Sequence, residues 1–425
     1  MSKFKEYKFS ALYKIDSGIS TSKEQAGHGA PFLTFKDVFN NYFLPESLSS
    51  CMETSEKEQQ IYSIKEGDIF LTRTSETLDE LAMSSVATKD YPHATYSGFL
   101  KRLRPLQQDI TYSKFMAFYL RSSYFRKIID NNATMTLRAS FNENVFSWLS
   151  LRLPSYEIQQ KIGDMLWNFE QKMRLNNHVN ATLEAMAKTL YDYWFVQFDF
   201  PDEKGRPYKT SGGKMVYNEE LGREIPAGWE VLPLHDICTV ISGYPFDSSL
   251  YDTDGDYHIL TIKNIQNGYI VPQTDSNIHE IPNDIPAVDI LKIGDILMSL
   301  TGNVGRVGIL CGNNYLLNQR AAIVQPQFDN IKWFLYFMFR NSAICMQIQN
   351  ISTGTSQKNV SPIDIGNIKI PYADRYMQNF NDTILSMVNT IIAKTVESQK
   401  LAVLRDWLLP MLMNGQVGFK GKSNE

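Results

Sequence analysis

The chain has 425 residues, which exceeds the usual size of a single domain, so we expect two or more folding units. Hydrophobic residues make up 43% of the sequence and charged residues 21%, a composition that excludes disordered and collagen-like proteins. The sequence shows no apolar run of membrane-spanning length and no signal-peptide pattern at its start, so a cytoplasmic location is expected.

The charge distribution gives little direct sign of a nucleic-acid partner, because the net charge is −4. Lysine and arginine outnumber acidic residues by 19 to 17 in residues 1–154, whereas acidic residues lead by 18 to 13 in residues 201–371. Neither part of the chain is basic. A DNA-binding function would therefore require locally placed positive charge, or partner subunits that supply much of the phosphate contact.

In chain order, residues 1–154 contain short runs of β-branched and aromatic residues separated by Gly, Pro, Asn and Asp. The run Asp68–Thr72 predicts a strand of a compact α+β domain, and a helical pattern extends from Ser113 to Ile129. After Pro154, a residue suited to a helix start, apolar residues follow a heptad-like spacing with polar positions in the middle. This stripe consists of Ile158, Ile162, Met165, Phe169, Lys172, Asn176, Val179, Leu183, Met186, Leu190 and Tyr193.

Residues 198–228 differ in character, since they are rich in Gly, Pro, Lys and Glu and indicate an ordered-to-flexible connector. A second series of strands follows, for example Tyr257–Thr261, with a helical pattern from Ile331 to Ile348. A second heptad-like stripe comes next, and each of its positions lies at one constant offset from the matching position of the first stripe. It consists of Tyr376, Phe380, Thr383, Met387, Thr390, Lys394, Glu397, Leu401, Leu404, Leu408 and Met411.

An internal repeat is the strongest signal in the sequence, because two widely separated blocks share one and the same offset in residue number. Two shorter matches at similar offsets support it. The blocks with the same offset are Leu33–Val38 with Leu260–Ile265 and Gly67–Leu71 with Gly294–Met298, and the shorter matches are Ser17-Gly18 with Ser242-Gly243 and Leu153-Pro154 with Ile370-Pro371.

The repeat predicts an α+β fold with two tandem mixed domains separated by two long helices. Roughly 40 helical residues form a rod of about 60 Å, and so long an apolar stripe should pack against its own copy as an antiparallel coiled coil. The alternative is a helix buried inside one large core. The length of the stripes, their preserved spacing and the absence of proline before Pro410 favour the helix pair.

The sequence offers no signature of catalysis, and neither a cofactor nor a metal is expected. Gly421-Lys422-Ser423 has Gln416 where a phosphate-binding loop requires glycine. No glycine-rich dinucleotide loop follows a predicted strand, and no adenine-methyltransferase tetrapeptide occurs. The acidic residues near Pro201 lie in the connector, where a solvated loop is the simpler interpretation. The four cysteines are too far apart for a zinc site or a disulfide framework, and the histidines are scattered.

Several further motifs accompany the repeat in a fixed order. They are Tyr96–Pro105 in the first copy, Ser211–Val216 in the connector, and Ile225–Glu230, Gly294–Leu297, Thr301–Gly305, Leu317–Arg320 and Gly354–Asn359 in the second copy. Each motif is weak alone. Together with the order domain–helix–domain–helix, they make nearly the whole chain resemble the specificity (S) subunits of type I restriction-modification systems.

The resemblance implies a non-catalytic subunit that reads a bipartite, asymmetric double-stranded DNA target. Two methyltransferase (M) subunits would bind along its helices, and restriction (R) subunits would join through that core. Adenine methylation and ATP-dependent cleavage would be the partners' chemistry. The implied domains are 1–154 (target recognition 1), 155–198 (central spacer helix), 199–229 (connector), 230–371 (target recognition 2), 372–414 (C-terminal spacer helix) and 415–425 (tail).

Basic and carboxamide side chains are the candidates for DNA contact, because Arg and Lys suit guanine edges or phosphates and Asn and Gln suit adenine edges. In the first domain the candidates are Lys36, Arg73, Thr74, Lys101, Arg102 and Arg138. In the second domain they are Lys263, Thr301, Asn303, Arg306, Gln319, Arg320 and Lys358. Any one of them could instead be a solvated or structural charge, and the repeat-equivalent Lys36 and Lys263 could serve the fold.

The first repeat departs from the family pattern in two places. Thr72–Glu76 replaces the glycine-rich turn, and Thr136–Ser140 replaces the glutamine-containing loop. The two domains are therefore expected to read different half-sites. Two alternatives remain: a two-domain protein-interaction scaffold that does not read DNA sequence, and an enzyme with an unrecognised site.

Overall fold

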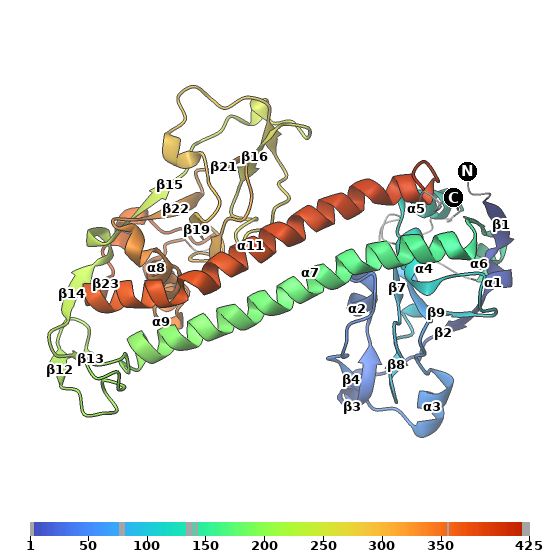
Figure 1. Ribbon diagram of the computed structural model, residues 1–425, viewed down its shortest axis with the longest axis horizontal. Helices are drawn as coiled ribbons and strands as arrows, with labels where there is room; N and C mark the ends of the chain where they lie inside the picture. The colour runs from blue at the N-terminus through green and yellow to red at the C-terminus, as the bar shows by residue number, and fades with distance from the viewer. Residues whose placement is uncertain (1–3, 76–80, 133–138, 141–142, 355–356, 419–425) are drawn as a thin grey trace, which may run out of the picture. The chain divides into compact units, whose positions relative to one another are not determined.

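The computed structural model describes residues 4–75, 81–132, 139–140, 143–354 and 357–418 (Figure 1). It divides into two compact units, one formed by Met1–Met173 with Lys400–Glu425 and the other by Arg174–Gln399. The division passes through both long helices. Each unit therefore combines one globular domain with one half of each helix.

The first unit is built around an antiparallel sheet with strand order β2-β9-β5-β7, next to a three-stranded sheet β4-β3-β8 and the pairs β1-β11 and β6-β10. Its strands are β1 (Lys5–Lys8), β2 (Tyr13–Ser17), β3 (Ala26–Leu33), β4 (Cys51–Met52), β5 (Ile69–Thr72), β6 (Thr74–Ser75), β7 (Ser84–Val86), β8 (Thr95–Tyr96), β9 (Leu100–Pro105), β10 (Ala139–Ser140) and β11 (Ser150–Leu153). Its short helices are α1 (Phe9–Leu12), η1 (Lys23–Gln25), α2 (Phe35–Phe39), α3 (Glu56–Ile61), α4 (Ser113–Tyr119), α5 (Ser123–Asn132) and α6 (Glu143–Trp148).

The second unit has the same plan, with a sheet in the order β15-β22-β19-β20-β17, a sheet β18-β16-β21 and the pair β14-β23. Its strands are β12 (Met215–Asn218), β13 (Arg223–Pro226), β14 (Glu230–Pro233), β15 (Cys238–Ser242), β16 (Tyr257–Leu260), β17 (Gly268–Tyr269), β18 (Asn277–Ile278), β19 (Ile296–Ser299), β20 (Val307–Ile309), β21 (Tyr315–Leu317), β22 (Ala321–Pro326) and β23 (Lys369–Tyr372). Its short helices are η3 (Leu234–Asp236), η4 (Ser248–Leu250), η5 (Ala287–Asp289), η6 (Asp329–Ile331), α8 (Lys332–Phe339), α9 (Ser342–Ile351) and α10 (Pro362–Gly366).

The predicted repeat is present in the strand registers. Leu71 of β5 faces Lys101 of β9, and Met298 of β19, which is the counterpart of Leu71 in the repeat, faces Ala322 of β22. The turn before each of these strands needs glycine, because Gly67 and Gly294 have φ values of 84° and 93°. The shared offset in the sequence therefore reflects one fold copied twice.

The two long helices are α7 (Tyr156–Tyr191), which a π-helical turn η2 (Asp192–Val196) extends, and α11 (Asp374–Met413). Within the second unit, the Asn176 amide donates to Glu397 at 3.0 Å and to Ser398 at 3.2 Å, and Asn180 donates to Thr395 at 3.0 Å. Residue numbers rise along α7 as they fall along α11, so the helices pair antiparallel. The polar middle of both predicted stripes thus lies in the contact between the helices.

The predicted heptad phase is wrong near the end of the first stripe. Met186 and Tyr193 were expected in the seam but are 51% and 36% exposed, whereas Ala187 and Tyr191 are buried. Because the stripe was assigned from large apolar side chains, the small Ala187 gave no signal. A helix of 3.6 residues per turn also drifts relative to a strict heptad.

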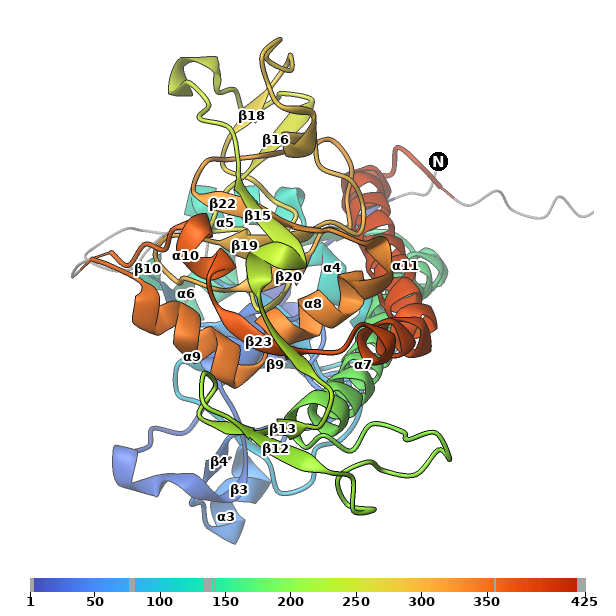
Figure 2. The ribbon, with the colours of Figure 1, turned by 90° about the vertical axis from the view of Figure 1, so that its left-hand side faces the viewer.

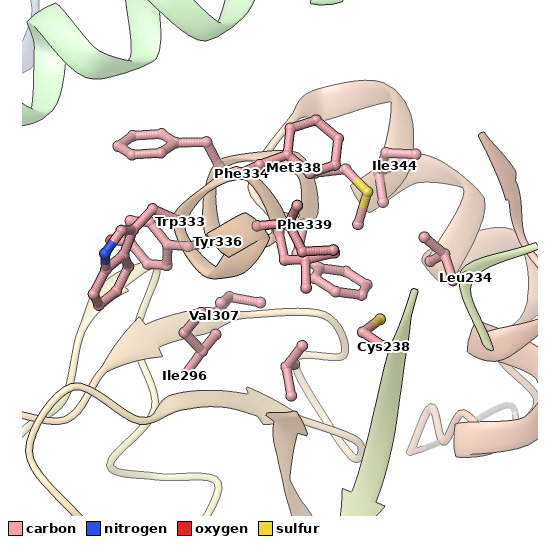
Figure 3. Close-up of a cluster of buried hydrophobic side chains, with 14 of the residues drawn as sticks. Leu234, Cys238, Ile296, Val307, Trp333, Phe334, Tyr336, Met338, Phe339 and Ile344 are labelled. Carbon is pink, nitrogen blue, oxygen red and sulfur yellow. The ribbon is translucent and has the colours of Figure 1, made fainter. Parts of the chain in front are cut away.

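Helix α8 is apolar on every side because it is enclosed on every side (Figure 3). It packs against β20 and β22, and Figure 2 shows α8 beside β20. Its buried side chains are Trp333, Phe334, Leu335, Tyr336, Phe337, Met338 and Phe339. The helix therefore forms the centre of the core in the second unit.

Each predicted helical stretch before the long helices is divided into two helices. Asn341 caps α9, since its side-chain oxygen accepts a hydrogen bond from the Ala343 amide. Between α4 and α5, the Ser122 hydroxyl accepts a hydrogen bond from the Phe125 amide in the same way. Asn and Ser at a helix start offer the backbone such a bond and interrupt a continuous helix. The apolar periodicity alone did not reveal these breaks.

The connector is ordered in the second unit by a hairpin and by aromatic packing. Strands β12 and β13 pair antiparallel. The buried ring of Phe200 lies 5.2 Å from the Trp229 ring and 4.0 Å from the Tyr376 ring of α11. The aromatic residues at its start thus fasten this glycine-rich segment to the helix.

Candidate nucleic-acid interface

Two loops of the second domain meet beside the end of β19. The Gly302 amide donates to the Lys358 carbonyl at 2.8 Å, and the Thr301 hydroxyl donates to the Asn359 side chain at 2.9 Å. Gly302 has a φ of 75°, a backbone conformation that favours glycine. Asn303 and Lys358 are exposed on these loops. Two segments that lie far apart in the sequence thereby share one surface.

A third loop, which leads into β22, joins the same surface. The Leu300 amide donates to the Arg320 carbonyl at 3.1 Å, and the Gln319 amide donates to the Tyr244 carbonyl at 3.1 Å. Both Gln319 and Arg320 are exposed. The structure therefore brings together five sequence-predicted candidates of the second domain: Thr301, Asn303, Gln319, Arg320 and Lys358.

Arg306 and Lys263 are engaged within the domain. Arg306 donates to the Gln266 side chain at 2.8 Å, and Gln266 donates to the Lys263 carbonyl at 2.9 Å. Lys263 forms an exposed ion pair with Asp275 at 2.7 Å, and this hydrogen bond raises the pKa of Lys263 above its ordinary value. Both cations could contact phosphate only by giving up or sharing a partner.

In the first domain, Arg73 and Lys36 are exposed. Arg73 follows β5, and its amide donates to the Phe99 carbonyl at 2.9 Å. Lys36 lies on α2. Arg138 lies outside the described residues, and the side chain of Thr74 is not described.

Lys101 and Arg102 are buried inside the first domain, with exposures of 5% and 4%. Lys101 donates to the Ser17 hydroxyl at 2.7 Å, and Arg102 forms an ion pair with Asp16 at 2.8 Å. Burial would raise the pKa of Asp16, but the hydrogen bonds from Arg102 and Lys14 hold it below the ordinary value. These two cations hold β9 to its neighbours, and we leave them out of the proposed DNA contact.

Two glycines and one aromatic residue were missed as parts of this surface. A Cβ atom on Gly18 would lie 2.1 Å from the Ser97 carbonyl oxygen, and one on Gly243 would lie 2.4 Å from the Leu317 carbonyl oxygen. Because these glycines lack a Cβ atom, the ends of β2 and β15 can approach the loops that carry Phe99 and Arg320. Their match in the repeat was a usable signal. Phe99 is 63% exposed on that loop, and its hydrophobic character gave no such signal.

The chemistry of the surface suits binding and positioning. Among the residues that the structure describes, no group of three or more His, Cys, Asp or Glu side chains could hold a metal ion. The four thiols are free, and burial raises the pKa of Cys238 to about 12. None of the helices that the structure describes combines the length and the apolar character of a membrane span. The exposed guanidinium, ammonium and carboxamide groups are the ones that recognise base edges and phosphates.

The duplicated α+β domain, with such groups on three adjoining loops of its second copy, is typical of the class of nucleic-acid recognition proteins. A family model described as "Type I restriction modification DNA specificity domain" matches residues 1–185 and 226–403. The chain belongs to this family. Its members are the non-catalytic specificity subunits of type I restriction-modification systems, in which partner subunits carry out catalysis.

Named relatives and a solved structure agree with the family. The chain is 24% identical to the type I restriction enzyme HindI specificity subunit of Haemophilus influenzae, over 98% of this chain and 100% of that protein. It is 26% identical to the MjaIX specificity subunit of Methanocaldococcus jannaschii, over 93% of this chain and 88% of that protein. The crystal structure of the S subunit from M. genitalium matches with a TM-score of 0.60 at 15% identity, over 97% of this chain and 96% of that one, and supports the fold.

Proposed function

We propose that this chain reads a bipartite, asymmetric DNA target, with one half-site for each recognition domain. The observation that carries the proposal is the copied surface. In both domains, a loop after the central strand is hydrogen-bonded to a loop before its neighbour, through Arg73 and Phe99 in the first domain and Leu300 and Arg320 in the second. The side chains differ between the copies, so the half-sites differ.

The proposed contacts in the second domain are Thr301, Asn303, Gln319, Arg320 and Lys358, with Arg306 and Lys263 beside them. In the first domain they are Arg73 and Lys36, with Thr74 and Arg138 as unassigned candidates. The guanidinium of Arg320 suits the two acceptors of guanine in the major groove, and Gln319 and Asn303 suit adenine. Lys358 suits a phosphate, which positions the protein without specifying sequence.

The long helices would set the gap between the half-sites. A helix of 36 residues such as α7 is about 54 Å long. One turn of duplex DNA is about 34 Å, so a spacer of this length corresponds to under two turns. The middle of such a target would remain unread.

Two methyltransferase subunits are proposed to bind along the helices, and restriction subunits to join through them. The support is the exposed apolar surface on the helices. On α7 and its extension η2, a shallow groove is lined by the apolar Ala181, Ala185, Met186, Leu190 and Tyr193 together with His178, Thr182 and Thr189, and on α11 Val403 and Trp407 are 70% and 62% exposed. Exposed apolar surface of this kind marks protein contacts. The complex would work in the cytoplasm, where the DNA is.

A domain exchange tests the reading function. The chain is co-purified with its methyltransferase subunits, and methylated adenines are mapped on genomic DNA. We expect a split, asymmetric site. Replacing residues 1–154 with the corresponding domain of another family member should change one half of the site and preserve the other. A methylation pattern that ignores the exchange would contradict the proposal and favour a scaffold.

The partner surface is tested separately. Met186→Glu places a charge in the apolar groove of α7 and should abolish co-purification of the methyltransferase. Asn177→Glu is the matched control, because residues 177 and 186 are nine positions apart and lie on opposite faces of a helix. Equal recovery of the methyltransferase with both variants would exclude this groove as the contact.

A further inference from the structure

We propose that Phe99 determines specificity in the first domain by contacting the 5-methyl group of a thymine. At the equivalent place in the second domain, Arg320 would read a guanine. This inference rests on the proposed function and deepens it, since it assigns the base that one side chain reads in each half-site.

The turns that carry Phe99 and Arg320 are copies of each other. The Phe99 amide donates to the Ser97 hydroxyl at 3.3 Å, and the Arg320 amide donates to the Asn318 side-chain oxygen, also at 3.3 Å. Each turn closes with a backbone bond of 2.9 Å, from Leu100 to the Ser97 carbonyl and from Ala321 to the Asn318 carbonyl. Phe99 therefore stands where Arg320 stands.

The bonds to the neighbouring elements agree with this equivalence. The residue before Phe99 donates to the Ile19 carbonyl at 2.7 Å, and the residue before Arg320 donates to the Tyr244 carbonyl at 3.1 Å. The Ser97 amide donates to Leu33 at 3.0 Å, and the Asn318 amide donates to Leu260 at 3.1 Å. Leu33 and Leu260 open the two matched blocks of the repeat, so they are themselves equivalent. The two turns thus have the same supports on both sides.

Charge and apolar character change places between the two copies. In the first domain the strand end carries the exposed Arg73 and the turn carries the exposed Phe99. In the second domain the strand end carries the buried Leu300 and the turn carries the exposed Arg320. In both domains the two residues are joined by the same backbone hydrogen bond. At these two joined positions each copy has one exposed cation, but it comes from a different loop in each copy.

A single exposed phenylalanine is common on a protein surface and means nothing by itself. The position of Phe99 indicates a function, because the equivalent turn of the second domain carries Arg320, a proposed DNA contact. A phenyl ring cannot hydrogen-bond a base edge, but it can cover the thymine methyl group, the main apolar feature of the major groove. An arginine in the same place prefers guanine.

Uracil substitution tests the contact directly. Once the target is mapped, each thymine of the first half-site is replaced by deoxyuridine, which removes only the methyl group. The wild-type complex with its methyltransferase should lose affinity at one position, by about fourfold for one buried methyl group. The Phe99→Ala complex should bind thymine and uracil at that position equally. Phe99→Leu, which keeps an apolar contact, should retain the preference for thymine.

Phe99→Arg should move the preference at that position from an A·T pair toward G·C, without affecting the second half-site. Phe328→Ala is the control, because Phe328 is also 60% exposed but lies beyond the far end of β22 from Arg320. A first half-site without a sensitive thymine, or equal uracil sensitivity in Phe99→Ala and wild type, would overturn the inference and leave the split target intact. Absence of a split target would instead overturn the proposed function.

Discussion

Arg405 on α11 donates a hydrogen bond to Glu170 on α7, and both side chains are mostly buried, at 15% and 13% exposure. The Arg405 guanidinium also lies 5.0 Å from the Tyr42 ring, and the Arg121 guanidinium lies 5.1 Å from the same ring. Tyr42 belongs to the recognition domain of this unit. The ion pair therefore joins both helices to the domain that they carry.

The other unit has a corresponding link. Arg340 follows α8 and forms an ion pair with Glu184 on α7, and it also donates to Asn267 at 3.1 Å and to the Tyr336 hydroxyl at 2.6 Å. Arg121 and Arg340 each donate their amide to a carbonyl three residues earlier, at 3.2 Å. They are equivalent in the repeat, but only Arg340 bonds to a long helix directly, whereas Arg121 donates to carbonyls of its own domain and lies against the Tyr42 ring that Arg405 also contacts.

The first prediction concerns the pair formed by Glu170 and Arg405. Arg405→Ala leaves the Glu170 carboxylate in a mostly buried place without its cation, which should lower the free energy of unfolding by about 3 kcal/mol. The double variant Glu170→Leu with Arg405→Met should recover most of that loss, because no unpaired charge remains. Chemical denaturation measures both. A double variant as unstable as Arg405→Ala would show that the loss of stability comes from lost packing and not from the unpaired charge.

The second prediction compares two repeat-equivalent aspartates. Asp68 is 1% exposed and accepts hydrogen bonds from Arg104 at 2.6 and 2.7 Å and from the Lys65 amide at 2.8 Å. Asp295 accepts the corresponding amide bond from Lys292 at 2.7 Å, but Gln325, which pairs with Thr239 as Arg104 pairs with Lys14, replaces the arginine in this domain. Asp68→Ala should therefore cost about 3 kcal/mol and Asp295→Ala about 1 kcal/mol. Equal losses in denaturation would contradict the role of the ion pair.

The sequence was sufficient to predict the duplicated α+β plan and the long helices, because repeats and helical periodicity leave patterns over many residues. The matched Gly-Asp turns were visible for the same reason, since the positive φ of Gly67 and Gly294 restricts the residue type. The seam phase was not fully predictable, because Ala187 packs through its small size. Local helix breaks at Ser122 and Asn341 depended on single side-chain bonds.

Site residues were harder to predict, because residue type does not report burial. Lys101 and Arg102 resemble a basic DNA contact in the sequence, but β9 pairs with β2 along one edge and with β5 along the other, and both side chains are buried. The grouping of Thr301, Arg320 and Lys358 depends on backbone bonds between distant loops. The equivalence of Phe99 and Arg320 required the hydrogen-bond pattern of both turns.

The third prediction is a pH dependence of stability. Asp289 is 2% exposed, and its Oδ1 atom has no hydrogen-bond partner among the described residues. Burial raises the pKa of Asp289 from 3.8 to about 6, so the folded state favours the protonated carboxyl. The stability that protonation confers is complete below about pH 4 and is lost as the pH rises through about 6.

Asp289→Asn removes this charge, and the variant should gain stability relative to wild type at pH 7.5 but not at pH 4. The gain should be about 1 kcal/mol, the scale of one unsatisfied buried polar group. Thermal unfolding of both proteins at the two pH values measures it. A difference that stays constant with pH would exclude titration of Asp289 as the cause.

The fourth prediction separates positioning from reading within one surface. Lys358 is exposed beside the Gly302 amide, and a lysine at that place suits a phosphate. Lys358→Ala should weaken binding of the complex to all sequences alike. The slope of log K against log salt should become shallower by about 0.9, since one fewer counterion is released.

Arg320→Ala should behave differently, because a base-reading arginine discriminates between sequences. It should lose about 1–3 kcal/mol on the mapped target only and relax one position of the second half-site. Lys204→Ala, in the connector, is the control for removing an exposed lysine and should leave both the slope and the target unchanged. The opposite result, in which Lys358→Ala alters the recognised sequence and Arg320→Ala alters only the salt slope, would contradict both assignments. Lys358 would then read the base, and Arg320 would contact the phosphate.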